Sequence, residues 1–160
     1  MDISHPQPLM VIQSFSIDGC YYMISGCQDH KIRIYDLETF QCLSTLEGHT
    51  RSIMCLFVYK NILISAATDR CLIMWDLERG FKSFIKIKLH GCGNVFSMIM
   101  TASLDLVLGC QDTTIRATPL KHLIESRLVE NITATSSSNR VADTNKCLLE
   151  TIELPFDLFT

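Results

Sequence analysis

The sequence Gly26-Cys27-Gln28-Asp29 recurs twice in similar form, as Ala66-Ala67-Thr68-Asp69 and as Gly109-Cys110-Gln111-Asp112. The aspartates of successive copies lie 40 and then 43 positions apart. Each copy follows a short apolar run and precedes a second run that is apolar or alternates between apolar and polar residues. Two such runs around a short polar turn are typical of a β-hairpin. The sequence therefore predicts a hairpin around each aspartate.

Further β-rich stretches flank these hairpins. One precedes each hairpin, at residues 9–15, 53–58 and 95–100, and another follows the first two, at residues 41–46 and 81–87. Four antiparallel strands in a repeat of about 40 residues form one blade of a β-propeller. We therefore predict an all-β chain with an N-terminal arm at 1–8 and blades at 9–47, 48–88 and 89–120, the third of them degenerate.

The repeat ends after residue 120, and an irregular tail is predicted for residues 121–160. Leu120, Leu123, Ile124 and Leu128 recur at helical spacing, which predicts a short amphipathic helix that ends near Glu130. Residues 131–145 are rich in Ser, Thr and Asn, as a loop or linker is. The apolar run at 147–154 predicts a strand that would complete the third blade.

These repeats resemble the WD-repeat family. The tryptophan–aspartate pair of that family is present as Trp75-Asp76, and Tyr35-Asp36 takes its place in the first repeat. Gly48-His49 matches the family's glycine–histidine pair, with His49 27 residues before Asp76. The resemblance covers residues 9–120 and implies a β-propeller, here a partial one, because a closed propeller has about four to eight blades.

A histidine, a serine, a turn aspartate and a tryptophan can form one buried hydrogen-bonded network, which stabilises only when every member has its partners. The second repeat supplies all four as a structural tetrad: His49, Ser65, Asp69 and Trp75. The first repeat supplies Ser25 and Asp29, with Tyr35 in the tryptophan position and His5 upstream. The third repeat keeps Asp112 but has Leu108 in the serine position and Thr118 in the tryptophan position. We therefore expect the complete network in the second blade.

Composition narrows the class of protein. Of the 160 residues, 48% are apolar and 19% charged, which predicts a packed core. The net charge is −3 without a basic run, so we expect no binding to nucleic acid or to a membrane surface. No apolar run approaches the roughly 18 to 20 residues of a membrane span. Eight cysteines without paired spacing, and a start without a signal-peptide pattern, predict a cytoplasmic protein, with the nucleus as the alternative.

One short stretch carries residues that could do chemistry. His90-Gly91-Cys92-Gly93 could hold a thiolate near backbone donors, but a degenerate glycine–histidine loop between two blades is the favoured interpretation. No Cys-x-x-Cys pair is present and the histidines are dispersed, so no metal site is expected. No phosphate-binding glycine loop or nucleophile elbow is present either. The sequence predicts no catalytic residues, no metal and no cofactor, and hence not an enzyme.

The family resemblance implies binding of other proteins or peptides. The face expected to meet them is formed by the loop before each first strand and by the turns that carry the aspartates. The candidate partner-binding residues on that face are Gln28, Arg51, Thr68, Asn94 and Gln111. The alternative interpretation is that they are ordinary surface residues. A scaffold or adaptor module is the function that we expect.

Two other functions remain open at this point. Residues 93–115 are weakly similar to a repeat in propeller–metallopeptidase fusions of glutathione degradation, so the chain could be the propeller part of such an enzyme without its catalytic domain. A substrate receptor of a ubiquitin ligase is the other alternative. Since three blades are too few for a closed ring, we expect a fragment of a longer propeller protein, with self-association or completion of the ring by another chain as the alternatives.

Overall fold

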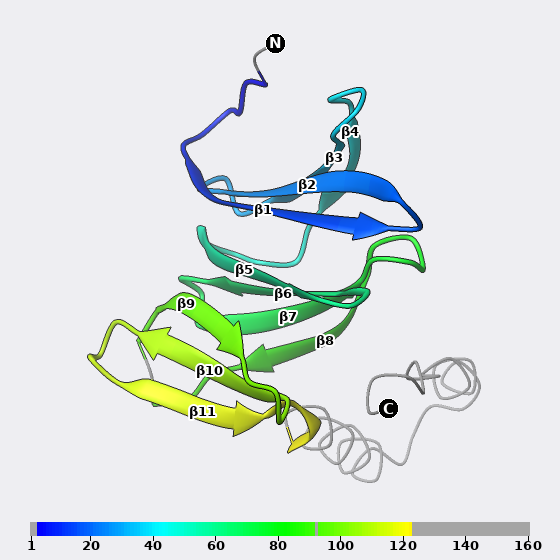
Figure 1. The fold of residues 1–160 in the computed structure, drawn as a ribbon. Coiled ribbons are helices and arrows are strands. Elements are labelled where there is room, and N and C mark those ends of the chain that lie inside the picture. Colours follow the sequence, from blue (N-terminus) through cyan, green and yellow to red (C-terminus); the bar gives the residue numbers. More distant parts are fainter. Residues whose placement is uncertain (1–2, 92, 123–160) are drawn as a thin grey trace, which may run out of the picture. The chain divides into compact units, whose positions relative to one another are not determined.

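The computed structural model describes residues 3–91 and 93–122, all of which belong to one compact unit, Met1–Arg127. Within these residues, antiparallel strands form three separate sheets (Figure 1). The described part of the chain is therefore nearly all β, with three consecutive blades, as the sequence predicts. No helix in this part of the chain is long and apolar enough to cross a membrane.

The first two blades each have four strands in sequence order. The strands of the first blade are β1 (Leu9–Ile17), β2 (Cys20–Cys27), β3 (Ile32–Asp36) and β4 (Cys42–Leu46). Those of the second are β5 (Ile53–Tyr59), β6 (Ile62–Ala67), β7 (Cys71–Asp76) and β8 (Lys82–Lys88). Each connection is short, as consecutive antiparallel neighbours allow. The turn between β1 and β2 has Asp18 and Gly19 at positive φ, 51° and 81°, which suits a two-residue hairpin.

The third blade has three strands among the described residues: β9 (Val95–Met100), β10 (Asp105–Cys110) and β11 (Ile115–Pro119). Leu120–His122 then adopt helical geometry, and the buried Leu120 closes the end of the blade. The remainder of the helix predicted up to residue 130, the loop at 131–145 and the strand at 147–154 lie outside the described residues.

The three blades share a register, which allows position-by-position comparison. In each, the first strand begins with the same kind of pair, namely Leu9 opposite Cys27, Ile53 opposite Ala67 and Val95 opposite Cys110, followed by a β-bulge. Leu9, Ile53 and Val95 are therefore equivalent. Ile53 and Val95 are buried, whereas Leu9 is exposed. The difference arises because the second and third blades each have a blade before them, and the first does not.

The first and second blades pack through one continuous apolar cluster. Ile24, Ile32 and Ile34 of the first blade meet Ile53 and Trp75 of the second. Gly26 makes this approach possible, because a Cβ there would lie 2.5 Å from Cγ2 of Ile53. The side chains of Ile53 and Val11 thus share the space that the missing Gly26 side chain leaves. Each buried aliphatic side chain of this kind contributes about 1.5–3 kcal/mol.

The second and third blades meet in the same way, through β5 and β6 on one side and β9 on the other. The buried apolar side chains of β9 and β10 include Val95, Met98, Leu106 and Leu108. Figure 1 shows the resulting order, with β5 between β1 and β9. The interface between neighbouring blades is therefore a repeated one, seen twice in this chain.

Candidate functional site

The predicted partner-binding residues lie where each second strand ends beside the entry to the first strand. The backbone N–H of Gln28 donates to the carbonyl of Pro8 over 3.0 Å, that of Thr68 to Ser52 over 3.0 Å and that of Gln111 to Asn94 over 2.8 Å. The three positions are thus structurally equivalent. We call the surface made by these turns and by the loops before β1, β5 and β9 (residues 5–8, 28–31, 47–52, 68–70, 90–94 without 92, and 111–114) the loop face; it lies on the left in Figure 1.

The repeated aspartate gives all three turns of the loop face one geometry. Its carboxylate accepts the backbone N–H two residues later, at 3.2 Å from Lys31 to Asp29, 3.0 Å from Cys71 to Asp69 and 3.2 Å from Thr114 to Asp112. This is the bond by which aspartate initiates a turn. The aspartate was therefore a reliable marker of the turn in the sequence.

The residue after each aspartate was missed in the sequence. His30, Arg70 and Thr113 have positive φ values of 70°, 60° and 66°, and all three side chains are exposed at the tip of the turn. Left-handed backbone is uncommon for residues other than glycine. The signal that could have located them is their fixed place directly after the repeated aspartate. They extend the set of side chains that the loop face displays.

In the second blade the structure brings together all four members of the predicted tetrad. Trp75 Nε1 donates to Ser65 Oγ over 2.9 Å, and Ser65 Oγ lies 2.8 Å from His49 Nε2. His49 Nδ1 lies 3.0 Å from an oxygen of Asp69, which also accepts the backbone N–H of Thr50 over 2.9 Å. A neutral His49 with its proton on Nδ1 satisfies every donor in this chain of bonds. The network therefore ties the loop before β5 to the turn after β6.

Burial governs the charge state of this network. Burial lowers the pKa of His49, and the charge of Lys86 adds to the effect, while Asp69 opposes it. Burial disfavours the ionised form of Asp69, but the hydrogen bonds from Thr50, His49 and Cys71 prevail and lower the pKa of Asp69. A neutral imidazole beside a carboxylate is the favoured state. His49 is a structural residue in this geometry.

The first blade does not form the same chain of bonds. The guanidinium of Arg33 binds Asp29 through two nitrogens, with contacts of 2.6 and 3.3 Å. Arg33 and the backbone of Lys31 overcome the effect of partial burial and lower the pKa of Asp29 to about 2. Tyr35 Oη approaches His5 Nε2 only to 3.5 Å, and the buried Ser25 Oγ has no hydrogen-bond partner. Arg33 has thus replaced the histidine as the partner of the aspartate.

The third blade keeps only the turn. Asp112 accepts a bond from the hydroxyl of Thr114 over 2.6 Å and lies 3.3 Å from the guanidinium of Arg116, which also donates to the carbonyl of Gly91. The hydrogen bond from Thr114 is the main cause of a lowered pKa for Asp112. Leu108 fills the serine position, so no buried polar network is present at that position.

The five candidate residues differ in their freedom to meet a partner. Gln28 and Arg51 are exposed, and Thr68 is half-buried. The side-chain N–H of Asn94 donates a 2.9 Å hydrogen bond to Oε1 of Gln111. These two side chains therefore form one continuous polar surface. Nearby, Lys31 pairs with Glu47 over 2.6 Å. The loop face is therefore polar and of mixed charge.

The described residues around His90 form no catalytic or metal-binding cluster. His90 is exposed and Cys92 lies outside the described residues. Among residues 3–91 and 93–122, no three His, Cys, Asp or Glu side chains gather as metal ligands do. Burial raises the pKa of the Cys55 thiol, which makes it less reactive.

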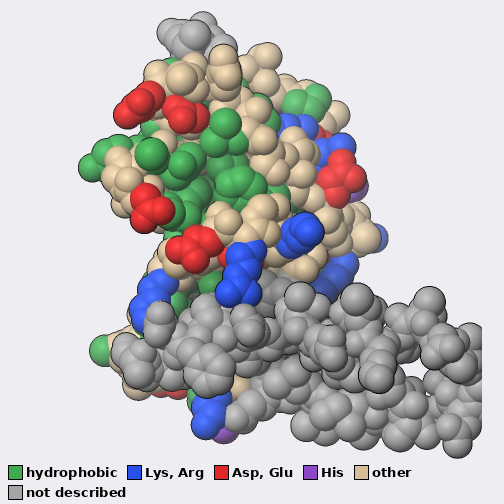
Figure 2. Space-filling view, turned by 90° about the vertical axis from the view of Figure 1, so that its right-hand side faces the viewer, with side chains coloured by type: hydrophobic (Ala, Val, Ile, Leu, Met, Phe, Trp, Pro, Cys, Tyr) green, Lys and Arg blue, Asp and Glu red, His purple; other side chains and the backbone are tan. Residues whose placement is uncertain are grey.

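The opposite side of the same unit, where β1–β2 and β7–β8 turn, carries a groove of about 400 Å³. Phe15, Tyr22 and Phe81 supply apolar walls, and Asp18 and Glu78 stand at its rim. Figure 2 shows hydrophobic side chains gathered in the upper half of this side, with acidic side chains beside them. The two sides of the unit thus differ in character.

Comparison with known proteins identifies the repeat. A model of the family described as WD domain, G-beta repeat matches residues 4–36 and 40–76. Mitochondrial division protein 1 of Aspergillus clavatus is 40% identical over 57 residues, or 36% of this chain and 9% of that protein. The sterol regulatory element-binding protein cleavage-activating protein of Xenopus laevis is 34% identical over 101 residues, or 62% of this chain and 7% of that protein. The chain thus matches only a small part of each of these relatives.

Solved structures agree on the fold. The computationally designed Ika4 protein superposes with a TM-score of 0.59 and 26% identity, covering 72% of this chain and 68% of that chain. The WD40 β-propeller domain of Doa1 superposes with a TM-score of 0.60 over 71% of this chain and 37% of that chain. At 24% identity the second likeness concerns the fold alone.

Proposed function

Because this chain carries WD40 repeats and folds as part of a WD40 β-propeller, we propose that it is a scaffold or adaptor module that binds other proteins or peptides through the loop face. The observation that supports this most directly is the threefold repetition of one turn geometry. Asp29, Asp69 and Asp112 each fix a turn that displays its neighbours beside the entry to a first strand. The same turn recurs in each blade at the end of a rigid sheet and exposes side chains there. Such an arrangement suits recognition of another protein surface.

Gln28, Arg51, Thr68, Asn94 and Gln111 are the residues that we propose for contact, with His30, Arg70 and Thr113 added at the turn tips. The polar and mixed character of these side chains suits the rim of a protein interface, and the arginines suit its centre. We propose no contact with nucleic acid or with a membrane.

Site-specific photo-crosslinking tests this proposal. A photoreactive amino acid is placed at Gln28 or Gln111 on the loop face, and at Asp18 or Ser103 on the opposite side as matched exposed controls. Covalent adducts with other proteins in cells are expected from the loop-face positions at several times the control yield. Equal yields from both sides, or adducts from the controls alone, would contradict the assignment.

The WD40 fold is typically a non-catalytic module, and we propose that this chain has no catalytic activity of its own. The metallopeptidase and ubiquitin-ligase alternatives draw no support from the relatives above. We also propose a reducing cytoplasmic or nuclear setting, which suits Cys27 and Cys55, since both pack in the core as small apolar side chains. Fractionation of cells that express the full chain with a small tag tests that location.

A further inference from the structure

The first blade leaves part of one sheet face uncovered. Leu9, Ile12 and Met23 lie on this face, which we call the first-blade outer face. Leu9 is 44% exposed and Ile12 is 54% exposed, whereas their equivalents in the second blade, Ile53 and Leu56, are 0% and 4% exposed. The second blade buries these positions against the blade before it. The first-blade outer face is therefore built like an interface, and among the described residues only the N-terminal arm lies against part of it.

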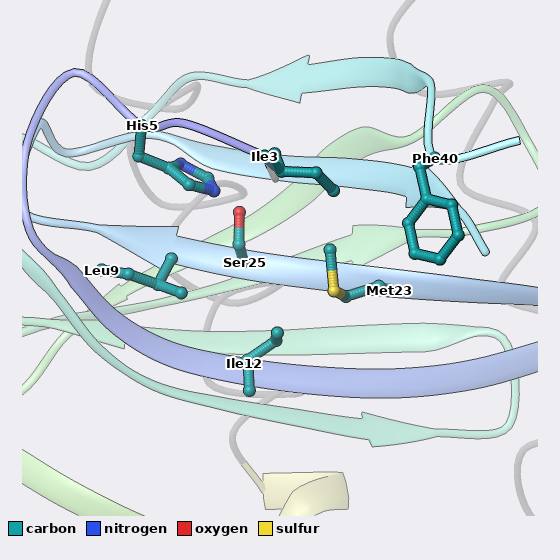
Figure 3. Close-up of a pocket in the computed structure, with 7 residues that line it drawn as sticks. All are labelled: Ile3, His5, Leu9, Ile12, Met23, Ser25 and Phe40. Atoms are coloured by element: carbon teal, nitrogen blue, oxygen red, sulfur yellow. The ribbon is translucent and has the colours of Figure 1, made fainter. Parts of the chain in front are cut away.

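This face is hollowed and has an unmet polar group. A pocket of about 310 Å³ lies between the N-terminal arm and β1 and β2, with Ile3, Phe40 and Met23 among its walls (Figure 3). Ser25 also lines the pocket, fully buried, and its hydroxyl has no hydrogen-bond partner. Buried polar groups are nearly always paired in a completed structure.

Among residues 3–91 and 93–122, no element covers the opposite face of the third blade. Ile99, Val107, Ile115 and Ala117 occupy neighbouring register positions beside Gly109, and we call them the third-blade outer face. Ile115 pairs with Gly109 as Ile32 pairs with Gly26 in the first blade. Ile32 is 1% exposed beneath the second blade, and Ile115 is 81% exposed. The third blade thus offers the face that the first blade uses to hold the second.

The two outer faces are complementary at the position where Ile53 of the second blade contacts Gly26 of the first. Between the first and second blades, Ile53 sits in the space left by the missing side chain of Gly26. The equivalent of Ile53 is Leu9, and the equivalent of Gly26 is Gly109. A Leu9 side chain placed over Gly109 therefore repeats the contact of Ile53 with Gly26, beside the Ser97 hydroxyl that lies against Gly109 as Val11 lies against Gly26. Both faces are otherwise apolar at their centres, so their contact removes exposed apolar surface.

We propose that two copies of this chain join head to tail, the third-blade outer face of each copy packing on the first-blade outer face of the other. Three blades from each copy give a closed ring of six, within the four to eight blades that propellers contain. An interface between two different faces must either close into a ring or extend into a fibre. Closure also removes the uncovered sheet faces, which would otherwise favour aggregation.

The test uses the full chain and two single substitutions, Leu9→Glu on one face and Ile115→Glu on the other. Both residues are exposed, so the blade interior is untouched, and thermal melts check that each variant keeps its fold. Ser83→Glu, at an exposed position of the middle blade, is the matched control for added charge. Sedimentation velocity at micromolar concentration measures the mass of each species.

We expect the wild type and Ser83→Glu to sediment at twice the chain mass of 18.1 kDa and each face variant to sediment as a monomer. A mixture of Leu9→Glu and Ile115→Glu should form a heterodimer, since each supplies the face that the other lacks. Its affinity should be at least tenfold weaker than that of the wild type, because one interface remains instead of two.

Several outcomes would overturn the proposal. A monomeric wild type would refute the contact between two copies. Wild-type assembly into open-ended polymers would refute closure of the ring. Dimerisation by either face variant alone, or a mixture that stays monomeric, would refute the head-to-tail pairing. Crosslinking from the loop face does not depend on this contact, so the failure of one proposal is distinguishable from the failure of the other.

Discussion

The indole N–H of Trp75 donates a 2.9 Å hydrogen bond to the hydroxyl of Ser65. In the first blade the same two positions are occupied by Tyr35 and Ser25, and Ser25 Oγ has no partner. The polar atom of a tyrosine lies at the far end of its ring, and Tyr35 Oη lies 3.5 Å from His5 Nε2 without making a hydrogen bond of normal length to Ser25. One substitution in the pattern therefore converts a satisfied polar network into an unsatisfied one.

This contrast predicts opposite results for the same mutation in two blades. Ser65→Ala leaves Trp75 Nε1 and His49 Nε2 without their partner and should lower the free energy of unfolding by about 1–3 kcal/mol. Ser25→Ala removes a hydroxyl that is buried without a partner and should be neutral or stabilising. Urea unfolding of the two variants measures the difference. Equal losses for both would mean that Ser25 is bonded after all.

The turn aspartates give a second matched pair. Asp69→Ala removes the acceptor for His49 Nδ1 and for the backbone N–H groups of Thr50 and Cys71, and should cost about 1–3 kcal/mol. Asp112→Ala removes an exposed acceptor whose partners can turn to water, and its effect should be clearly smaller. Thermal melts under identical conditions compare the two. A larger loss for Asp112→Ala would contradict the assigned roles.

The fold was predictable because its signals are local. The aspartate at 29, 69 and 112 marks a turn by bonding its own backbone, and the flanking runs are short strands in register. The members of the second-blade tetrad could be named because each has a fixed place in the repeat. The pairing of Asp29 with Arg33 could not be predicted from the sequence, because the repeat pattern does not indicate which long side chain folds back onto the turn.

The sequence did not indicate which apolar strand residues are exposed to solvent. Leu9 and Ile53 occupy the same register position with similar side chains, yet only Ile53 is buried. Burial of such a residue depends on whether a neighbouring blade packs against it, and the local sequence pattern does not indicate whether that blade is present. The roles of Gln28, Arg51, Thr68, Asn94 and Gln111 in binding stay predictions for the same reason, since a partner defines them.

Stability should depend on pH in two stages. The pKa of His49 is lowered from 6.5 in the fold, so below that pH the unfolded chain takes up a proton that the folded chain does not, and stability falls. The pKa values of Asp69 and Asp29 are lowered from 3.8, so the stability they contribute is present above that pH and is lost as the pH falls through their folded values, about 2 for Asp29.

Urea midpoints measured from pH 8 to pH 3 should therefore decrease towards acid, first near the pKa of a free imidazole and again below the pKa of a free carboxyl. His49→Gln should remove the first decrease and leave the second. A midpoint that rises between pH 7 and pH 5 would mean that His49 is protonated in the folded chain, as an ion pair with Asp69.

The contact between Gly26 and Ile53 predicts coupling between two blades. Gly26→Ala places a methyl group 2.5 Å from Cγ2 of Ile53 and should cost about 1–3 kcal/mol through overpacking. Ile53→Ala leaves a cavity and should cost about 2–5 kcal/mol. In the double variant the new methyl group occupies part of the space that Ile53 vacates, so the two losses should sum to more than the measured total, by about 0.5–3 kcal/mol. Gly109→Ala combined with Ile53→Ala is the control, since Gly109 faces away from the second blade and the two losses should add. Additivity at Gly26 as well would show that the first two blades do not meet through this pair.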